Sequence, residues 1–122
     1  MKVIDTDIFI DFFRGFPQAL PYLKEHADEI SFSAITEGEL LSGSICNNNK
    51  EREKVFHVLS QFEKIPVDNP LIQIAADIRR TYRLELPDAI VAASALITNA
   101  TLITRNMRDF QKIHGLQLQK PY

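Results

Sequence analysis

The 122-residue sequence contains one cysteine, no tryptophan and no long apolar run. Cys46 cannot form an internal disulfide, so nothing indicates an oxidising compartment. The histidines His26, His57 and His114 lie far apart and form no zinc-binding pattern. The longest uncharged stretch, residues 89–104, is interrupted by polar residues and is shorter than the roughly 20 apolar residues of a membrane span. The sequence therefore predicts a cytoplasmic protein without disulfide, structural zinc or membrane contact.

An excess of positive charge is also missing. The chain has 14 Lys and Arg against 16 Asp and Glu, a net charge of −2. Affinity for phosphates normally comes from Lys and Arg, which counts against a nucleic-acid-binding protein. Removing four acids held together at a metal site would leave the rest of the chain at +2. Charge alone therefore neither supports nor excludes RNA as a partner.

Short apolar segments alternate with longer segments of helical periodicity. The predicted strands are residues 3–4, 30–33, 65–67, 101–104 and 116–118. The predicted helices are residues 7–14, a segment after Pro17, and residues 35–45, 51–62, 71–82 and 88–97. This alternation predicts an α/β fold with a mainly parallel central sheet of about five strands, flanked by helices. Functional residues in such sheets lie at the carboxyl ends of the strands.

Four separated acids occupy positions near predicted strand ends or helix starts. Asp5 follows the first strand, Glu39 lies on the helix after the second, Asp88 opens the most apolar helix, and Asp109 follows the fourth strand. Carboxylate oxygens are ligands that Mg²⁺ and Mn²⁺ prefer. A metal held this way activates water and offsets charge during phosphodiester hydrolysis. The four acids are therefore the candidate site.

Each acid alone has an ordinary structural explanation. Asp88 after a proline fits the first turn of a helix, where the helix dipole favours an acid. Glu37 lies on the same predicted helix as Glu39, and one of the two should face solvent. Asp7 fits a cap of the first helix better than a metal ligand, and Asp11 is expected on the solvated surface. The hypothesis of a shared site depends on the acids occurring together.

Four motifs follow one another along the chain, at residues 4–7 (IDTD), 33–43 (SAITEGELLSG), 86–93 (LPDAIVAA) and 104–110 (TRNMRDF). Together they resemble the PIN-domain ribonucleases, specifically the VapC toxins of bacterial and archaeal toxin–antitoxin pairs. The resemblance spans nearly the whole chain and implies one PIN-like nuclease domain over residues 1–122.

The resemblance implies a Mg²⁺- or Mn²⁺-dependent endoribonuclease that uses metal-activated water and leaves a 5′-phosphate and a 3′-hydroxyl. The implied catalytic and metal-holding residues are Asp5, Glu39, Asp88 and Asp109. The implied supporting residues are Thr6, Asp7, Thr104 and Asn106. The family most often has Asn at the position of Asp7, which leaves open whether Asp7 joins the metal ligands or only supports Asp5.

The resemblance also implies partners: an RNA substrate, a VapB-like antitoxin that blocks the site with a C-terminal segment, and a second copy in a homodimer. The basic residues expected to contact RNA or antitoxin are Arg14, Arg79, Arg83, Arg105 and Arg108. A solvated helix face explains Arg79 and Arg83 equally well.

Three other functions compete with the ribonuclease interpretation. A phosphotransfer receiver domain would use Asp5, Asp7, Asp68, Thr104 and Lys120. Lys120 leaves no room for a following helix, however, and Glu39 and Asp109 would have no role. A haloacid-dehalogenase-like phosphatase would use Asp5 as phospho-acceptor, but the chain lacks the later acid pair and lysine motif. The third alternative is an inactive module that only binds other proteins.

Overall fold

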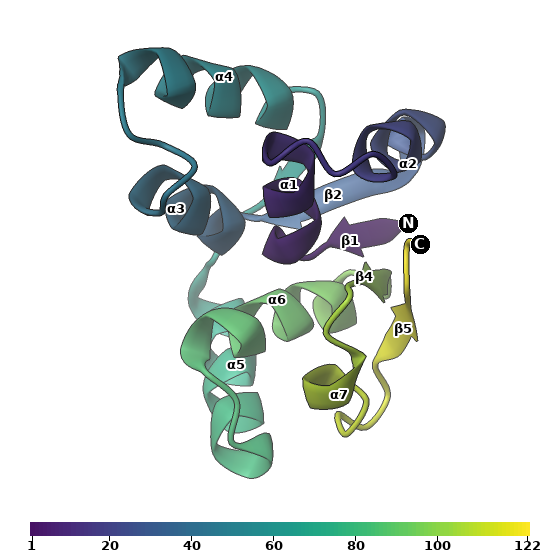
Figure 1. Ribbon diagram of the computed structural model, residues 1–122. Helices are drawn as coiled ribbons and strands as arrows, with labels where there is room; N and C mark the ends of the chain where they lie inside the picture. Colours follow the sequence, from purple (N-terminus) through teal and green to yellow (C-terminus); the bar gives the residue numbers. More distant parts are fainter.

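Five short strands form the centre of the molecule in a computed structural model that describes all 122 residues (Figure 1). The strands are β1 (Lys2–Ile4), β2 (Ile30–Ser33), β3 (Glu63–Ile65), β4 (Thr101–Ile103) and β5 (Gln117–Gln119). Their order in the sheet is β3-β2-β1-β4-β5, and every neighbouring pair is parallel. The predicted α/β fold with a parallel central sheet is confirmed.

Helices cover both faces of this sheet. They are α1 (Thr6–Phe13), α2 (Ala19–Glu25), α3 (Ala34–Ser42), α4 (Asn49–Leu59), α5 (Asn69–Tyr82), α6 (Leu86–Ile97) and α7 (Met107–Phe110), with one 3₁₀ turn, η1 (Ala27–Glu29). Figure 1 shows α1 to α4 above the strands and α5 to α7 below them. None of these helices combines the length and apolar character that a bilayer crossing requires.

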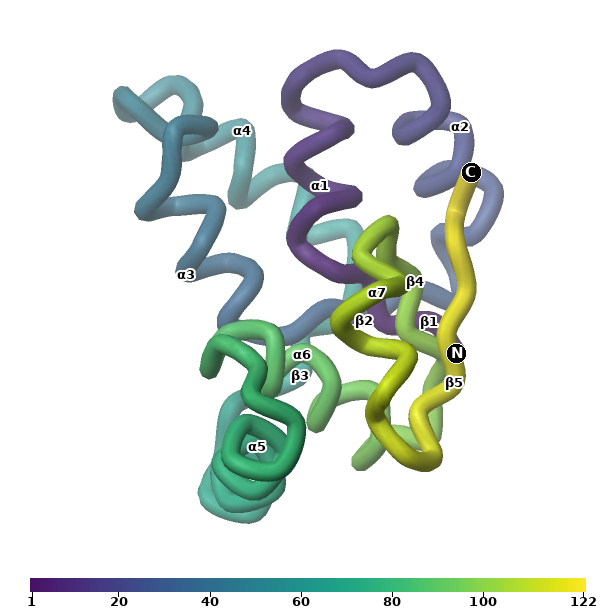
Figure 2. The backbone as a smooth tube through the Cα atoms, turned by 60° about the horizontal axis from the view of Figure 1, so that its bottom comes forward, coloured from purple at the N-terminus to yellow at the C-terminus, as the bar shows by residue number.

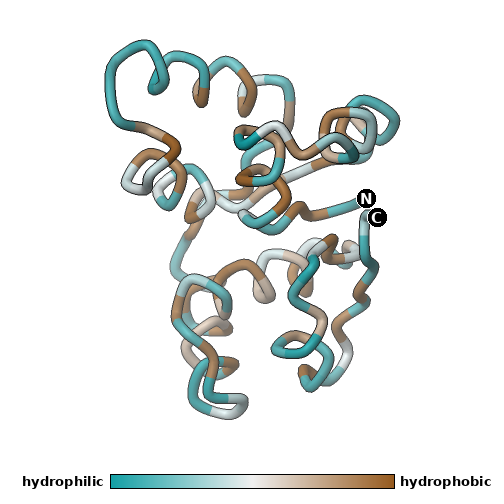
Figure 3. Tube along the Cα trace, in the orientation of Figure 1, coloured by the Kyte–Doolittle hydropathy of each residue, from teal (hydrophilic) through white to brown (hydrophobic).

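Neighbouring residues of the central strands point into two separate cores. Val3 of β1 and Leu102 of β4 pack with α5 and α6, whereas Ile4 and Ile103 pack with α1 to α4. All four are fully buried, as expected for a parallel sheet covered on both faces. Figure 3 shows the matching difference between helices: α6 is mostly brown and white, whereas α4 is mostly teal. The strands are therefore held from both sides.

Strand β3 lies two residues earlier than predicted, at Glu63–Ile65 instead of residues 65–67. Pro66 has no N–H to continue the ladder, so pairing with β2 ends at Ile65. Exposed Glu63 and Lys64 fit an edge strand. Periodicity predicted neither the 3₁₀ turn η1 nor the single-turn helix α7, because both are too short to show a repeat.

The parallel arrangement brings the strand ends to one edge of the sheet. Asp5 follows β1, Ser33 ends β2 and begins α3 as its N-cap, and Thr104 follows β4. Figure 2 shows α1, α3, α6 and α7 around these strand ends. This edge is where the predicted site residues have to meet.

Candidate active site

Asp5 is fixed at the junction of β1 and α1. Its amide donates to the carbonyl oxygen of Ile103 at 2.9 Å, which continues the sheet by one residue. Its Oδ1 accepts from the Thr6 amide at 2.8 Å and caps α1, and its Oδ2 accepts from the Thr104 hydroxyl at 2.8 Å. The residue is only 6% exposed. Both of its neighbours therefore hold the carboxylate rigidly at the strand end.

Glu39 reaches the same edge from α3. The Thr6 hydroxyl donates to Glu39 Oε1 at 2.7 Å and lies 2.9 Å from the Thr36 hydroxyl. Glu37 instead accepts from Lys64 at 3.1 Å, away from this group. The structure thus places Glu39, and not Glu37, beside Thr6. Thr36 was not predicted, although it lies one turn before Glu39 on the same helix face.

Asp88 and Asp109 complete the set from the other side of the sheet. Asp88 lies in the first turn of α6, which begins at Leu86, two residues before the predicted start. Asp109 lies on α7, where its Oδ2 accepts from Asn106 Nδ2 at 3.1 Å. The Asn106 amide donates to the Thr104 hydroxyl oxygen at 2.9 Å. The three-residue spacing of Asn106 and Asp109 therefore brings their side chains together, as predicted.

Asp7 is not the cap of the first helix. Helix α1 begins at Thr6, so Asp5 is the cap and Asp7 lies inside the first turn. Asp7 Oδ2 accepts from the Arg105 amide at 3.0 Å. Its Oδ1 is buried and has no partner in the protein. Asp7 therefore connects α1 to the segment after β4 and leaves one buried oxygen unpaired.

Burial and neighbouring carboxylates raise the pKa values of Asp5, Asp7 and Asp88. Burial, together with the charges of Asp7 and Asp88, raises the pKa of Asp5 to about 7, although the hydrogen bonds from Thr104 and Thr6 act to lower it. The pKa of Asp88 is raised by burial and then by Glu39 and Asp109. The pKa of Asp7 is also raised, mainly by burial. The group is therefore electrostatically strained whenever all its members are ionised.

The donor set fits a hard divalent cation. Carboxylate, hydroxyl and amide oxygens surround the site, and no His or Cys side chain belongs to it. The neighbours with the largest charge effect on Asp88 are all acids, which a cation would offset. No three of these side chains converge closely enough in this structure to form a complete metal-binding group. Ion binding would therefore require side-chain movements.

The predicted basic contacts are dispersed over the surface. Arg14 caps the far end of α1, about 14 Å along the helix from Asp5. Arg79 lies in the last turn of α5 and Arg83 follows it in the left-handed conformation at φ 58°, both exposed. Arg108 is exposed on α7, and Arg105 forms an ion pair with Asp11. Their contacts with RNA or an antitoxin stay a prediction.

Asp11, expected on the solvated surface, is buried. That expectation was wrong because Arg105, distant in sequence, covers the carboxylate with a hydrogen bond and a second ion-pair contact. The spacing of four residues between Asp7 and Asp11 places both acids on one face of α1, a signal visible in the sequence.

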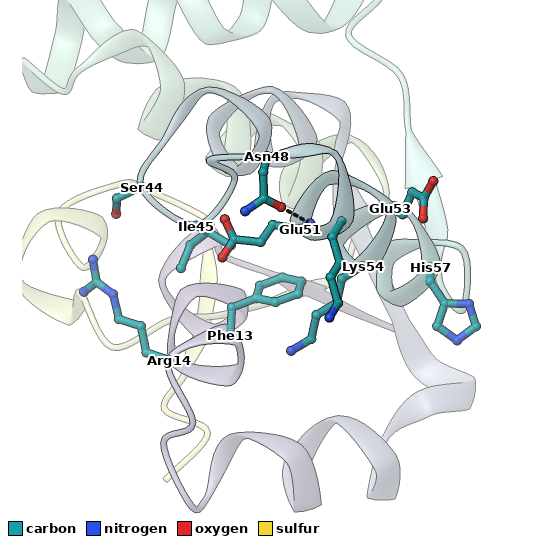
Figure 4. Close-up of a pocket in the computed structure, with 10 residues that line it drawn as sticks. Phe13, Arg14, Ser44, Ile45, Asn48, Glu51, Glu53, Lys54 and His57 are labelled. Atoms are coloured by element: carbon teal, nitrogen blue, oxygen red, sulfur yellow. Dashed lines mark hydrogen bonds between the residues drawn. The ribbon is translucent and has the colours of Figure 1, made fainter.

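The largest hollow of the molecule lies elsewhere. A groove of about 840 Å³ runs between the end of α1 and helix α4, and none of the four acids lines it. Figure 4 shows Phe13 of α1 facing Glu51 and Lys54 of α4. A choice of site by cavity volume alone would therefore select this groove and miss the acidic edge of the sheet.

Nearly the whole chain matches one known domain family. The model of the PIN domain matches residues 2–116. The chain belongs to the PIN-domain family. This PIN domain is 32% identical to Ribonuclease VapC19 of Mycobacterium tuberculosis, an alignment that covers 96% of this chain and 98% of the relative. It is 28% identical to Ribonuclease VapC1 of Haemophilus influenzae, over 96% of this chain and 95% of the relative.

Solved structures agree with this membership. A toxin–antitoxin complex from Klebsiella pneumoniae contains a chain that superposes with a TM-score of 0.85 at 32% identity, over 100% of this PIN domain and 98% of that chain. DNA-bound VapBC from Salmonella typhimurium also gives a TM-score of 0.85, over 99% and 98%, at 18% identity. The second similarity concerns the fold alone.

Proposed function

We propose that this PIN domain is a metal-dependent endoribonuclease and the toxin of a type II toxin–antitoxin pair, with residues 1–122 acting as one nuclease unit. The observation that carries the proposal is the acidic edge of the sheet, where burial and like charges raise the pKa values of Asp5 and Asp88. A bound divalent cation would offset the repulsion among these carboxylates and stabilise their ionised forms. The relatives that cover nearly the whole chain are ribonucleases by name, which supports RNA as the substrate.

The proposed roles follow from position. Asp5 and Asp88 would anchor the principal ion, Mg²⁺ or Mn²⁺, and Glu39 and Asp109 would complete the site. When bound, the ion supplies an activated water and offsets the charge that develops on the phosphate. Thr104 holds one oxygen of Asp5 by its hydroxyl, so that the carboxylate keeps its orientation.

Two supporting side chains hold the remaining acids. Thr6 donates to Glu39 and Asn106 donates to Asp109, and the charges of both carboxylates raise the pKa of Asp88. The Thr6 amide also donates to Asp5, and the Asn106 amide also donates to the Thr104 hydroxyl oxygen. The acids are thus connected through short hydrogen bonds rather than through basic side chains.

The topology disfavours a phosphotransfer receiver domain. Asp68, its candidate phospho-acceptor, follows edge strand β3, which is separated from β1 by β2. The Asp68 side chain instead caps α5 by accepting from the Leu71 amide at 3.1 Å. For a phosphatase with Asp5 as nucleophile, the charged neighbours with the largest effect on Asp5 are acids, whereas the chemistry needs a lysine.

The proposed partners are an antitoxin of the VapB type and a second copy of this chain. The structural relatives include toxin–antitoxin complexes, one with 32% sequence identity. A basic antitoxin side chain inserted among the acids would offset the same repulsion as a metal ion. Co-expression with its VapB-type antitoxin should suppress cleavage, and sedimentation of the purified toxin should give a dimer mass. Cleavage that continues unchanged in the co-purified complex would contradict the antitoxin proposal.

A cleavage assay with purified protein tests the enzymatic proposal. The substrate is a mixture of synthetic single-stranded RNAs that together contain every five-base sequence, with Mg²⁺ or Mn²⁺ added to metal-stripped protein. We expect cleavage by wild type, none by Asp88→Asn, and wild-type cleavage by Asp28→Asn, which changes an exposed acid of η1. Metal-independent cleavage, or full activity of Asp88→Asn, would contradict the assignment.

A further inference from the structure

The segment of residues 104–106, between β4 and α7, supplies much of the hydrogen bonding of the acidic site. It donates three hydrogen bonds to acids of the site, from Thr104 Oγ1 to Asp5, from the Arg105 amide to Asp7, and from Asn106 Nδ2 to Asp109. Asp5 at the start of α1, Asp7 within α1 and Asp109 on α7 therefore all depend on the placement of this one segment. The geometry of the acids therefore also depends on the contacts that hold this segment in place.

Arg105 is anchored to α1 by a two-point ion pair. Its Nε lies 2.8 Å from Asp11 Oδ2, and a terminal nitrogen donates to Asp11 Oδ1 at 2.9 Å. The Asp11 side chain is only 12% exposed, whereas that of Arg105 is 49% exposed. Two parallel bonds between guanidinium and carboxylate fix orientation as well as distance. The ion pair thus holds the Arg105 backbone in a defined position against α1.

The last residue of the chain reinforces this pair. The Tyr122 hydroxyl donates to Asp11 Oδ2 at 2.7 Å. Burial and the bond to Asp11 raise the pKa of Tyr122, so the hydroxyl stays protonated and remains a donor. The Tyr122 ring lies 5.2 Å from that of Phe16, centre to centre. Asp11 therefore accepts two hydrogen bonds and has one further ion-pair contact, all from residues distant in sequence.

We propose that Asp11 and Arg105 are positioning residues for the nuclease site, an inference that rests on the proposed function. The Asp11–Arg105 pair joins the segment 104–106 to α1, one helical turn from Asp7. It thereby keeps the Arg105 amide on Asp7 and the Thr104 hydroxyl on Asp5. Misplacing such groups by about 1 Å can cost about a hundredfold in rate. Neither side chain needs to touch the RNA for this effect.

A different role for Arg105 makes the opposite prediction. If its half-exposed guanidinium bound an RNA phosphate, Arg105→Gln would raise KM, and Asp11→Asn would leave cleavage intact or improve it by freeing the arginine. If the pair positions the segment, either substitution should lower kcat, and the double variant should be no worse than the weaker single variant. Asp11→Asn therefore separates the two roles.

The first arm of the test measures cleavage of one RNA that wild type cuts, taken from the synthetic mixture. We expect Asp11→Asn and Arg105→Gln to lower kcat about tenfold or more with KM changed less than about twofold, and Arg105→Lys to recover part of the loss. The matched control is Arg80→Gln, which removes an exposed ion pair with Asp77 on α5 and should have no effect. A higher KM for Arg105→Gln with normal Asp11→Asn would overturn the proposal.

The second arm does not depend on nuclease activity. In Asp11→Asn, amide hydrogen exchange at Arg105 should be at least about tenfold faster, whereas exchange at Asp5, bonded to Ile103, should be unchanged. Unchanged exchange at Arg105 would overturn the positioning role. If wild type cleaves no RNA, the proposed function fails. Faster Arg105 exchange would then still support the placement of the segment by this pair.

Discussion

Replacing Asp5 by asparagine should stabilise the metal-free protein while abolishing the proposed activity. Burial and neighbouring acids raise the pKa of Asp5 from 3.8 to about 7. Because the folded state then binds a proton more tightly than the unfolded chain, stability is lost as pH rises between these two values. A shift of this size corresponds to roughly 4 kcal/mol at pH 8, at 1.36 kcal/mol for each pKa unit.

Asparagine keeps the shape of the side chain and the oxygen that caps α1, but it has no charge to desolvate. In EDTA, Asp5→Asn should therefore exceed wild type by about 2–4 kcal/mol in unfolding free energy at pH 8, with a much smaller difference near pH 5. Urea unfolding at both pH values measures this, with exposed Asp28→Asn as the matched control. A variant equal to or less stable than wild type at pH 8 would refute the electrostatic argument.

Three further predictions concern the same site. Thr104→Val removes the donor to Asp5 and the acceptor of the Asn106 amide. It should lower the free energy of unfolding, measured in urea, by about 2–4 kcal/mol. A loss below about 0.5 kcal/mol, roughly the error of such measurements, would contradict this prediction. Mn²⁺ should raise the melting temperature of wild type at pH 8 and raise that of Asp88→Asn much less, as calorimetry would show. Glu39→Gln should abolish cleavage and Glu37→Gln, paired with Lys64, should not; equal activities would contradict the placement of Glu39.

The architecture and the meeting of the acids could be predicted because both depend on local signals. Apolar strands such as β2, residues 30–33, carry enough pattern to be located exactly. Parallel pairing then brings Asp5 and the residues after β4 to one edge without further information. The order of the four motifs connected those positions to a nuclease family.

Contacts between distant residues could not be predicted in this way. Asp11 and Arg105 are 94 residues apart, and only the folded chain shows that one covers the other. The position of Asp7 was misjudged because the end of β1 decides where α1 begins. The Asp5 amide still bonds to Ile103, and the helix starts at the next residue, so that Asp5 becomes the cap.

The most direct test of the account is a transcriptome-wide map of 5′-phosphate RNA ends in bacteria, minutes after induction of the protein. The map requires no choice of substrate, because every cellular RNA is present. New ends at one or a few defined sites, present with wild type and absent with Asp5→Asn, are the result predicted by a nuclease site built on the four carboxylates. The same ends in both samples, or no new ends with wild type while the protein is soluble, would contradict it.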